Sequence, residues 1–109
     1  MTTDEQPRGS LDERSEQNWA GVPGLIRADC ESYLLSKLPR ETLLKWKDQH
    51  ARGISIGSDE GVFHFGTGMW VRNLLRDQLT DGELPYPPDW DDYYMGALAA
   101  VVERFEPGD

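Results

Sequence analysis

The chain has 109 residues and a formal net charge of −9 at pH 7, which allows one domain with one modest core. Such an acidic chain is repelled by nucleic acid and by anionic membranes, and no apolar run approaches the ~20 residues that cross a bilayer. With Cys30 as its one cysteine and with two histidines, the chain has no internal disulfide. This composition argues against a structural zinc site, indicates no cofactor and suits a reducing cytoplasm.

The first 20 residues are predicted to form a disordered acidic arm, followed by a single helical domain over residues 21–106. The stretch MTTDEQPRGSLDERSEQN at residues 1–18 has two apolar side chains, Met1 and Leu11. Two apolar side chains cannot offset the entropy of ordering this backbone. The sequence GVPG at residues 21–24 then predicts a turn where the arm meets the domain.

Two helices are predicted after this turn. Pro39 ends the first helix and suits the first position of the second, where its missing N–H is not needed. Glu41 then falls in the first turn of the second helix, and Gly53 lies just beyond its end. The first helix begins near Leu25, and its apolar residues recur at steps of three and four: Ile26, Cys30, Tyr33, Leu34 and Leu38.

Two further helices follow a stretch at residues 54–65 that the sequence leaves open between strand, helix and loop. A third helix is predicted over residues 67–79. The proline-rich sequence LPYPPDW at residues 84–90 must be extended or turning, and Asp89 then caps a last helix with a broad apolar face. The sequence therefore predicts an all-α single domain of about four helices.

The sequence GVFHFGTGMWVRN at residues 61–73 contains a Gly-x-Gly ahead of the third helix, as an anion-binding loop would. A Walker loop requires Lys and then Ser or Thr after its last glycine, but Met69 and Trp70 follow here. A dinucleotide fingerprint requires a third glycine and a βαβ unit, which this chain does not offer. The pattern therefore argues against a phosphate loop.

The same two glycines have a structural explanation. Glycine within a helix costs roughly 1 kcal/mol relative to alanine, so two in three positions need a reason. An aromatic side chain of the last helix, Trp90 or Tyr94, is predicted to pack closely against them. Arg72 is then predicted to pair with Asp89, and Asn73 to satisfy the backbone of the proline-rich connector.

Four polar residues form a candidate cluster around this stretch: His64, Arg72, Asn73 and Asp89. As a small-ligand or enzymatic site, Arg72 would hold an anionic ligand and His64 would act as acid or base. The alternative for His64 is a partly buried histidine with a satisfied ring. The alternative for Arg72 and Asp89 is a structural clasp beneath the connector.

The motif HFGTGMWVRN, followed by PPDW and a terminal amphipathic helix, resembles an uncharacterised family of small bacterial proteins. That family carries a motif close to H-F-G-x-G-M-W-x-R-N and then a stretch like H-P-D-D-M-S. The resemblance covers residues 58 to 105, although Pro87 stands where a histidine is usual and Trp90 where a second aspartate is usual. It implies a shared fold and the polar cluster, but no reaction.

The leading hypothesis for function is a non-enzymatic protein-binding module, such as an accessory, immunity or antitoxin-like protein of a bacterium or phage. The chain is small and acidic, lacks a complete catalytic set, and carries seven acidic and one basic side chain in residues 83–109, which suits a basic partner. The alternatives are the small-ligand or enzymatic site and an acidic mimic of nucleic acid. Aromatic side chains typical of interface anchors complete the prediction: Trp70, Tyr86, Trp90, Tyr93 and Tyr94.

Overall fold

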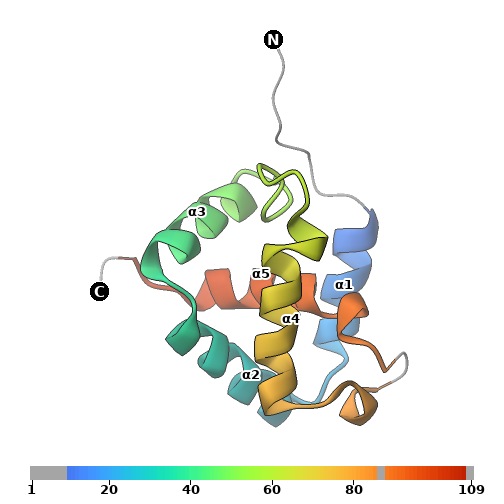
Figure 1. Ribbon diagram of the computed structural model, residues 1–109. Coiled ribbons are helices and arrows are strands. Elements are labelled where there is room, and N and C mark those ends of the chain that lie inside the picture. Colours follow the sequence, from blue (N-terminus) through green and yellow to red (C-terminus); the bar gives the residue numbers. More distant parts are fainter. Residues whose placement is uncertain (1–9, 86–87, 108–109) are drawn as a thin grey trace.

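The computed structural model describes residues 10–85 and 88–107, and in these ranges it is helical, without strands (Figure 1). The all-α prediction is confirmed, but the count is five helices rather than about four. Three 3₁₀ turns join them: η1 (Phe63–Phe65), η2 (Asp81–Glu83) and η3 (Trp90–Asp92). The five α-helices are α1 (Ser10–Ala20), α2 (Gly24–Lys37), α3 (Arg40–Ala51), α4 (Thr67–Gln78) and α5 (Tyr94–Arg104).

The last helix, α5, lies at the centre of the molecule. It crosses behind α4, with α1, α2 and α3 around it, and it contacts all four of these helices (Figure 1). Ala97, Leu98 and Val101 of α5 have no exposed surface. The broad apolar face predicted for this helix is therefore the surface against which the other four helices pack.

The additional helix is α1, which occupies a segment predicted to be part of a disordered arm. Residues 1–9 of that arm lie outside the described residues, but residues 10–20 are helical, so the prediction is wrong there. Trp19 explains the difference, because its indole is buried and its Nε1 donates to Glu31 Oε2 at 2.8 Å. Burial of this large aromatic side chain with a satisfied N–H, together with the packing of α1 on α5, helps to offset the entropy of ordering the segment.

The first and last helices meet at a close backbone contact. The amide of Gly96 donates to Ser15 Oγ at 2.9 Å, and Ser15 is buried. A methyl group at Gly96 would lie 2.3 Å from the backbone oxygen of Ser15. The absence of a side chain at residue 96 therefore sets how closely α1 approaches α5.

Residues 54–65, which the sequence leaves open, form turns followed by η1, and the end of α3 holds the turns in place. The buried Gln49 accepts from the amide of Gly57 at 2.8 Å and donates to Asp59 Oδ1 at 2.8 Å. Gly57 has a φ of +79°, which favours glycine, and the ring of Phe63 packs directly against its Cα. One glutamine therefore fixes this loop through two hydrogen bonds.

The proline-rich connector between α4 and α5 is held at both ends by one carboxylate. Asp81 Oδ1 lies 2.6 Å from Arg76 Nε, and Asp81 Oδ2 accepts from the amide of Trp90 at 2.9 Å. The indole of Trp90 also donates to the backbone oxygen of Leu79 at 2.8 Å. These contacts bring the start of α5 beside the end of α4.

Candidate functional site

Arg72, the central residue of the predicted polar cluster, is buried in an ion pair. Its side chain is 5% exposed, and Nε lies 2.9 Å from Asp91 Oδ1. Its guanidinium carbon lies 4.9 Å from the centroid of the Tyr94 ring, as in a cation–π contact. The prediction that Arg72 pairs with Asp89 is therefore wrong, since the partner lies two residues later. The Asp89 carboxylate instead caps η3, because it accepts from the amide of Asp91 at 2.9 Å.

The close packing predicted for the glycines is found at Gly68 of α4. A methyl group there would lie 2.8 Å from the backbone oxygen of Phe63 and 3.1 Å from the hydroxyl oxygen of Tyr94. Of the two aromatic residues that were predicted for this contact, Tyr94 is the one beside Gly68. The Gly-x-Gly therefore allows η1, α4 and α5 to approach one another.

The other members of the polar cluster do not join Arg72. Asn73 is exposed and accepts from Arg76 Nη1 at 3.1 Å, so the prediction that it satisfies the connector's backbone is wrong. Asp81 and Tyr93 perform that role, since the Tyr93 hydroxyl donates to the backbone oxygen of Pro85 at 2.8 Å. His64 lies in η1, but its side chain lies outside what the structure describes.

Most of the predicted interface aromatics belong to the core instead. Trp90, Tyr93 and Tyr94 are buried, because their rings pack around α5 and their polar atoms have internal partners. Trp70 is 42% exposed and remains available to a partner, whereas Tyr86 lies outside the described residues.

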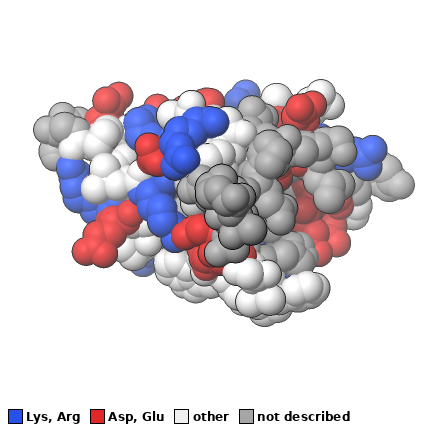
Figure 2. Space-filling view, turned by 90° about the horizontal axis from the view of Figure 1, so that it is seen from above, with Lys and Arg blue, Asp and Glu red and all other residues white. Residues whose placement is uncertain are grey.

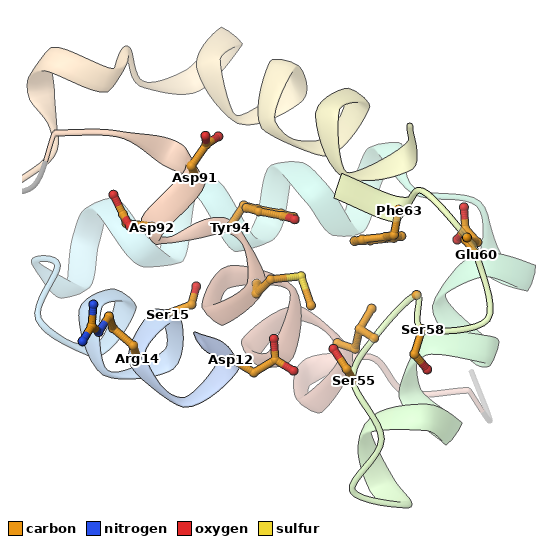
Figure 3. A pocket seen from close by; sticks show the side chains of 14 residues that line it. Asp12, Arg14, Ser15, Ser55, Ser58, Glu60, Phe63, Asp91, Asp92 and Tyr94 are labelled. Atoms are coloured by element: carbon orange, nitrogen blue, oxygen red, sulfur yellow. The ribbon is translucent and has the colours of Figure 1, made fainter. Parts of the chain in front are cut away.

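An open cleft of about 510 Å³ lies between α1, the loop after α3 and the start of α5 (Figure 3). Four acidic side chains and one basic side chain line it, so we call it the acidic cleft. Its lining consists of Asp12, Arg14 and Ser15, of residues 55–58, 60, 61 and 63, and of Asp91, Asp92, Tyr94 and Met95.

Aromatic rings form one side of the acidic cleft. Figure 3 shows the rings of Phe63 and Tyr94 directed into it, and these rings are nearly parallel with centroids 6.5 Å apart. Phe63 also packs edge-on against Trp46 at 5.7 Å and lies against Gly57. Burial raises the pKa of the Tyr94 hydroxyl, although Arg72 opposes the effect. The aromatic side is therefore neutral at physiological pH, and Trp46 and Gly57 hold the Phe63 ring in position.

The acidic side chains of the cleft differ in their partners. Glu60 accepts from the hydroxyl of Thr67 at 2.6 Å, and Asp91 pairs with Arg72. Asp12 and Asp92 make no side-chain hydrogen bond or ion pair with the part of the chain that the structure describes. Two carboxylates are thus uncommitted.

The orientation of the charged side chains makes the cleft more acidic than its composition alone suggests. Figure 3 shows the Asp12 carboxylate directed into the cleft, whereas the Arg14 side chain points away from it. The hydroxyl oxygen of Ser58, another lining residue, is buried and has no hydrogen-bond partner among the described residues. The Asp12 and Asp92 carboxylates are therefore hydrogen-bond acceptors without a cation partner among the described residues.

An exposed apolar surface adjoins the acidic cleft. Its members belong to one short segment that runs from the residue before η1 into the first turn of α4. Gly61 and Phe63, which line the cleft, flank the first of them in the chain. We call this surface the apolar patch; it consists of Val62, Phe65, Met69 and Trp70.

Sequence reasoning missed the cleft because one of its walls is α1. A signal was present in the sequence SLDE at residues 10–13, which has the S-x-x-E pattern of a helix N-terminus. Ser15 and Trp19, four residues apart, also mark one helical face. The remaining lining residues come from segments far apart in the chain, which no local pattern connects.

No family model, no curated protein and no solved structure matches this chain. The resemblance of residues 58–105 to an uncharacterised bacterial family therefore stays a prediction. Within the described ranges, no helix has the length and apolarity to span a bilayer, and no three His, Cys, Asp or Glu side chains are grouped as metal ligands.

Proposed function

We propose that this chain is a non-enzymatic protein-binding module, of the accessory, immunity or antitoxin-like kind, that binds a basic partner. The observation that carries the proposal is the position of the acidic cleft beside the apolar patch. Gly61 and Phe63 of the cleft flank Val62 of the patch in the chain, so the two surfaces meet at this point. Protein interfaces commonly have this arrangement of an apolar centre with a polar rim.

Charge supports a basic partner. Seen from above, visible Lys and Arg atoms gather on the side of α3, and acidic atoms predominate on the side of α1 (Figure 2). Such a field raises the rate at which a partner of opposite charge arrives in the correct orientation. Trp70 would supply the aromatic anchor, since tryptophan is enriched among the residues that dominate binding energy.

The two alternative functions have less support. A small-ligand or enzymatic site built on His64, Arg72, Asn73 and Asp89 would require Arg72 to leave Asp91 in order to hold an anion. A mimic of nucleic acid would need acidic residues spaced regularly along a face. The acidic cleft instead combines carboxylates with aromatic rings and serine hydroxyls.

The test is capture of a partner from a lysate of the native host by the tagged protein and two charge variants. The first variant carries Asp12→Asn and Asp92→Asn in the cleft. The second carries Asp29→Asn and Glu41→Gln, which are exposed on α2 and α3, so both variants have the same net charge. A Trp70→Ala variant tests the apolar patch.

The proposal predicts that the wild-type protein and the α2/α3 variant retain a stoichiometric basic protein, whereas the cleft variant and Trp70→Ala lose it. Loss of the partner should also follow a rise in salt, because exposed charges more than a Debye length apart are screened. Capture of no stoichiometric partner, or equal capture by both charge variants, would contradict the proposal.

A further inference from the structure

We infer that the acidic cleft receives one arginine side chain of a partner, with the guanidinium at Asp12 and the aliphatic stem along Phe63 and Tyr94. This inference rests on the proposed function and narrows it to a single recognised group. The cleft, its uncommitted carboxylates and its aromatic side each support a different part of the inference.

The size of the cleft suits a side chain rather than a whole helix. Its volume of about 510 Å³ falls within the range of about 300–1,000 Å³ that holds small molecules in proteins. Helix α1 and the loop after α3 form opposite walls (Figure 3). An occupant must therefore enter end-on from solvent, as a long side chain does.

Charge selects a cation. Asp12 and Asp92 have no ion-pair partner among the described side chains, and the one basic lining residue, Arg14, points away from the cleft. A cation entering the cleft therefore meets two carboxylates that no cation among the described residues neutralises. Glu60 and Asp91 belong to the same rim, although their charges are shared with Lys45 and Arg72.

The aromatic side favours arginine over lysine. A guanidinium is planar and stacks on aromatic faces, and its stem can lie along apolar surface. Arg72 already lies 4.9 Å from the centroid of Tyr94, and Asp91 balances its charge. Phe63 is nearly parallel to Tyr94 and is only half-buried, so its ring offers the flat surface to a second planar group.

The hydrogen-bond acceptors also match a guanidinium. Arginine carries five N–H donors, whereas a lysine ammonium carries three. Figure 3 shows the hydroxyl of Ser55, a lining residue, on the same side of the cleft as the Asp12 carboxylate. Ser55 thus adds a hydroxyl acceptor for a group held at Asp12.

The experiment titrates the full-length ¹⁵N-labelled protein with the capped tripeptide acetyl-Gly-Arg-Gly-amide and follows backbone amide shifts. Its control is the same peptide with citrulline, which keeps the shape of arginine and removes the charge. A lysine peptide of the same form compares the two cations. We expect saturable shifts near Asp12, Ser58 and Phe63, with a Kd on the order of 1 mM for a single side chain.

The variants locate the contact. We expect Asp12→Asn to weaken binding of the arginine peptide about tenfold and Ser55→Ala to weaken it severalfold, while Asp29→Asn on α2 leaves it unchanged. The citrulline peptide should cause no saturable shift, and the lysine peptide should bind more weakly than the arginine peptide. Thermal unfolding of each variant confirms that it is folded.

Equal binding of arginine and lysine peptides, shifts spread over all acidic surfaces, or binding that Asp12→Asn leaves intact would overturn the inference. These outcomes are separable from failure of the proposed function. If the cleft variant loses the captured partner but the tripeptide does not bind, the binding module stands and arginine recognition fails. If the tripeptide binds at the cleft but no partner is captured, the proposed protein partner fails instead.

Discussion

The amide of Gly96 and the hydroxyl of Ser15 form a buried hydrogen bond of 2.9 Å that joins the first and last helices. The contact leaves no space for a Cβ at residue 96, because the Ser15 oxygen would lie 2.3 Å from it. Two helices separated by most of the chain are therefore fixed by a pair of small residues, and one wall of the acidic cleft depends on this contact.

Gly96→Ala should destabilise the protein, since the new methyl group must push α1 away from α5. Overpacking of this kind costs about 1–3 kcal/mol. Gly82→Ala is the matched control, because nothing lies within 4 Å of a methyl group there. Urea unfolding followed by circular dichroism measures both. Equal stability of the two variants would show that α1 adjusts freely.

Arg72 and Asp91 should be energetically coupled, whereas Arg72 and Asp89 should not be. Double-mutant cycles with Arg72→Ala, Asp91→Ala and Asp89→Ala measure both couplings by thermal unfolding. Because the Asp91 side chain is 46% exposed, we expect a coupling of about 0.5–1 kcal/mol for the first pair. Additive effects of Arg72→Ala and Asp91→Ala would contradict the ion pair.

Gly57→Ala should damage the loop that forms the second wall of the acidic cleft. Gly57 has a φ of +79°, and a methyl group there would lie 2.2 Å from the Phe63 ring. Gly53→Ala separates the two effects, since Gly53 has a φ of +72° but open space around it. We expect about 1–2 kcal/mol of backbone strain in both variants and additional loss at Gly57 alone.

Cys30 should resist modification and should make the protein sensitive to alkali. Burial, with Asp29 and Glu31 nearby, raises the pKa of the Cys30 thiol to about 11. The thiol in the unfolded chain ionises near its usual pKa of 9.0, so the raised native pKa stabilises the fold below pH 9. This contribution is lost as the pH rises from about 9 to about 11.

Iodoacetamide labelling at pH 8 measures the first effect, and we expect native Cys30 to react far more slowly than in urea. Unfolding free energy as a function of pH measures the second, with Cys30→Ala as the control that loses part of the alkaline slope. Labelling of Cys30 at the same rate in the native and unfolded protein would contradict its burial.

Asp81 should contribute to stability through the connector and lose that contribution in acid. Its hydrogen bond from Arg76, with another from the Trp90 amide, lowers the pKa of the Asp81 carboxyl below its usual 3.8. A lowered native pKa means that the stabilisation is complete above 3.8 and disappears as the pH falls through the native pKa.

Asp81→Asn should therefore cost about 1 kcal/mol at neutral pH, since the Arg76–Asp81 pair is partly exposed. The cost should shrink toward pH 2 as the wild-type carboxyl becomes protonated. Asp29→Asn, on an exposed side of α2, is the control. A cost that does not change between neutral and acidic pH would contradict an ionised Asp81 at this position.

Local sequence patterns predicted four of the five helices because their apolar faces are continuous. The predicted helix over residues 67–79 appears as Thr67–Gln78, and Pro39 separates α2 from α3 as expected. Helix α1 escaped prediction because its burial depends on Trp19 meeting Glu31 and on Ser15 meeting Gly96. Neither partner is visible from the composition of the first 20 residues.

The candidate site was harder to predict than the fold. The close packing of an aromatic residue against Gly68 could be predicted, because glycine is unfavourable within a helix unless another residue packs closely against it. Tyr94 is that residue. The choice between Asp89 and Asp91 did not follow, because a carboxylate that caps a turn folds back on its own backbone and leaves the next carboxylate to Arg72. The acidic cleft combines three distant segments, and only the fold brings them together.

The central position of α5 governs the order in which this protein can fold. Every other helix buries its apolar face against a segment that the ribosome synthesises after it. A nascent chain that ends before residue 94 lacks the surface on which α1 to α4 assemble, so its apolar faces remain open to chaperones or to other chains. Folding is therefore a late, concerted event in which the arrival of one helix closes the whole core.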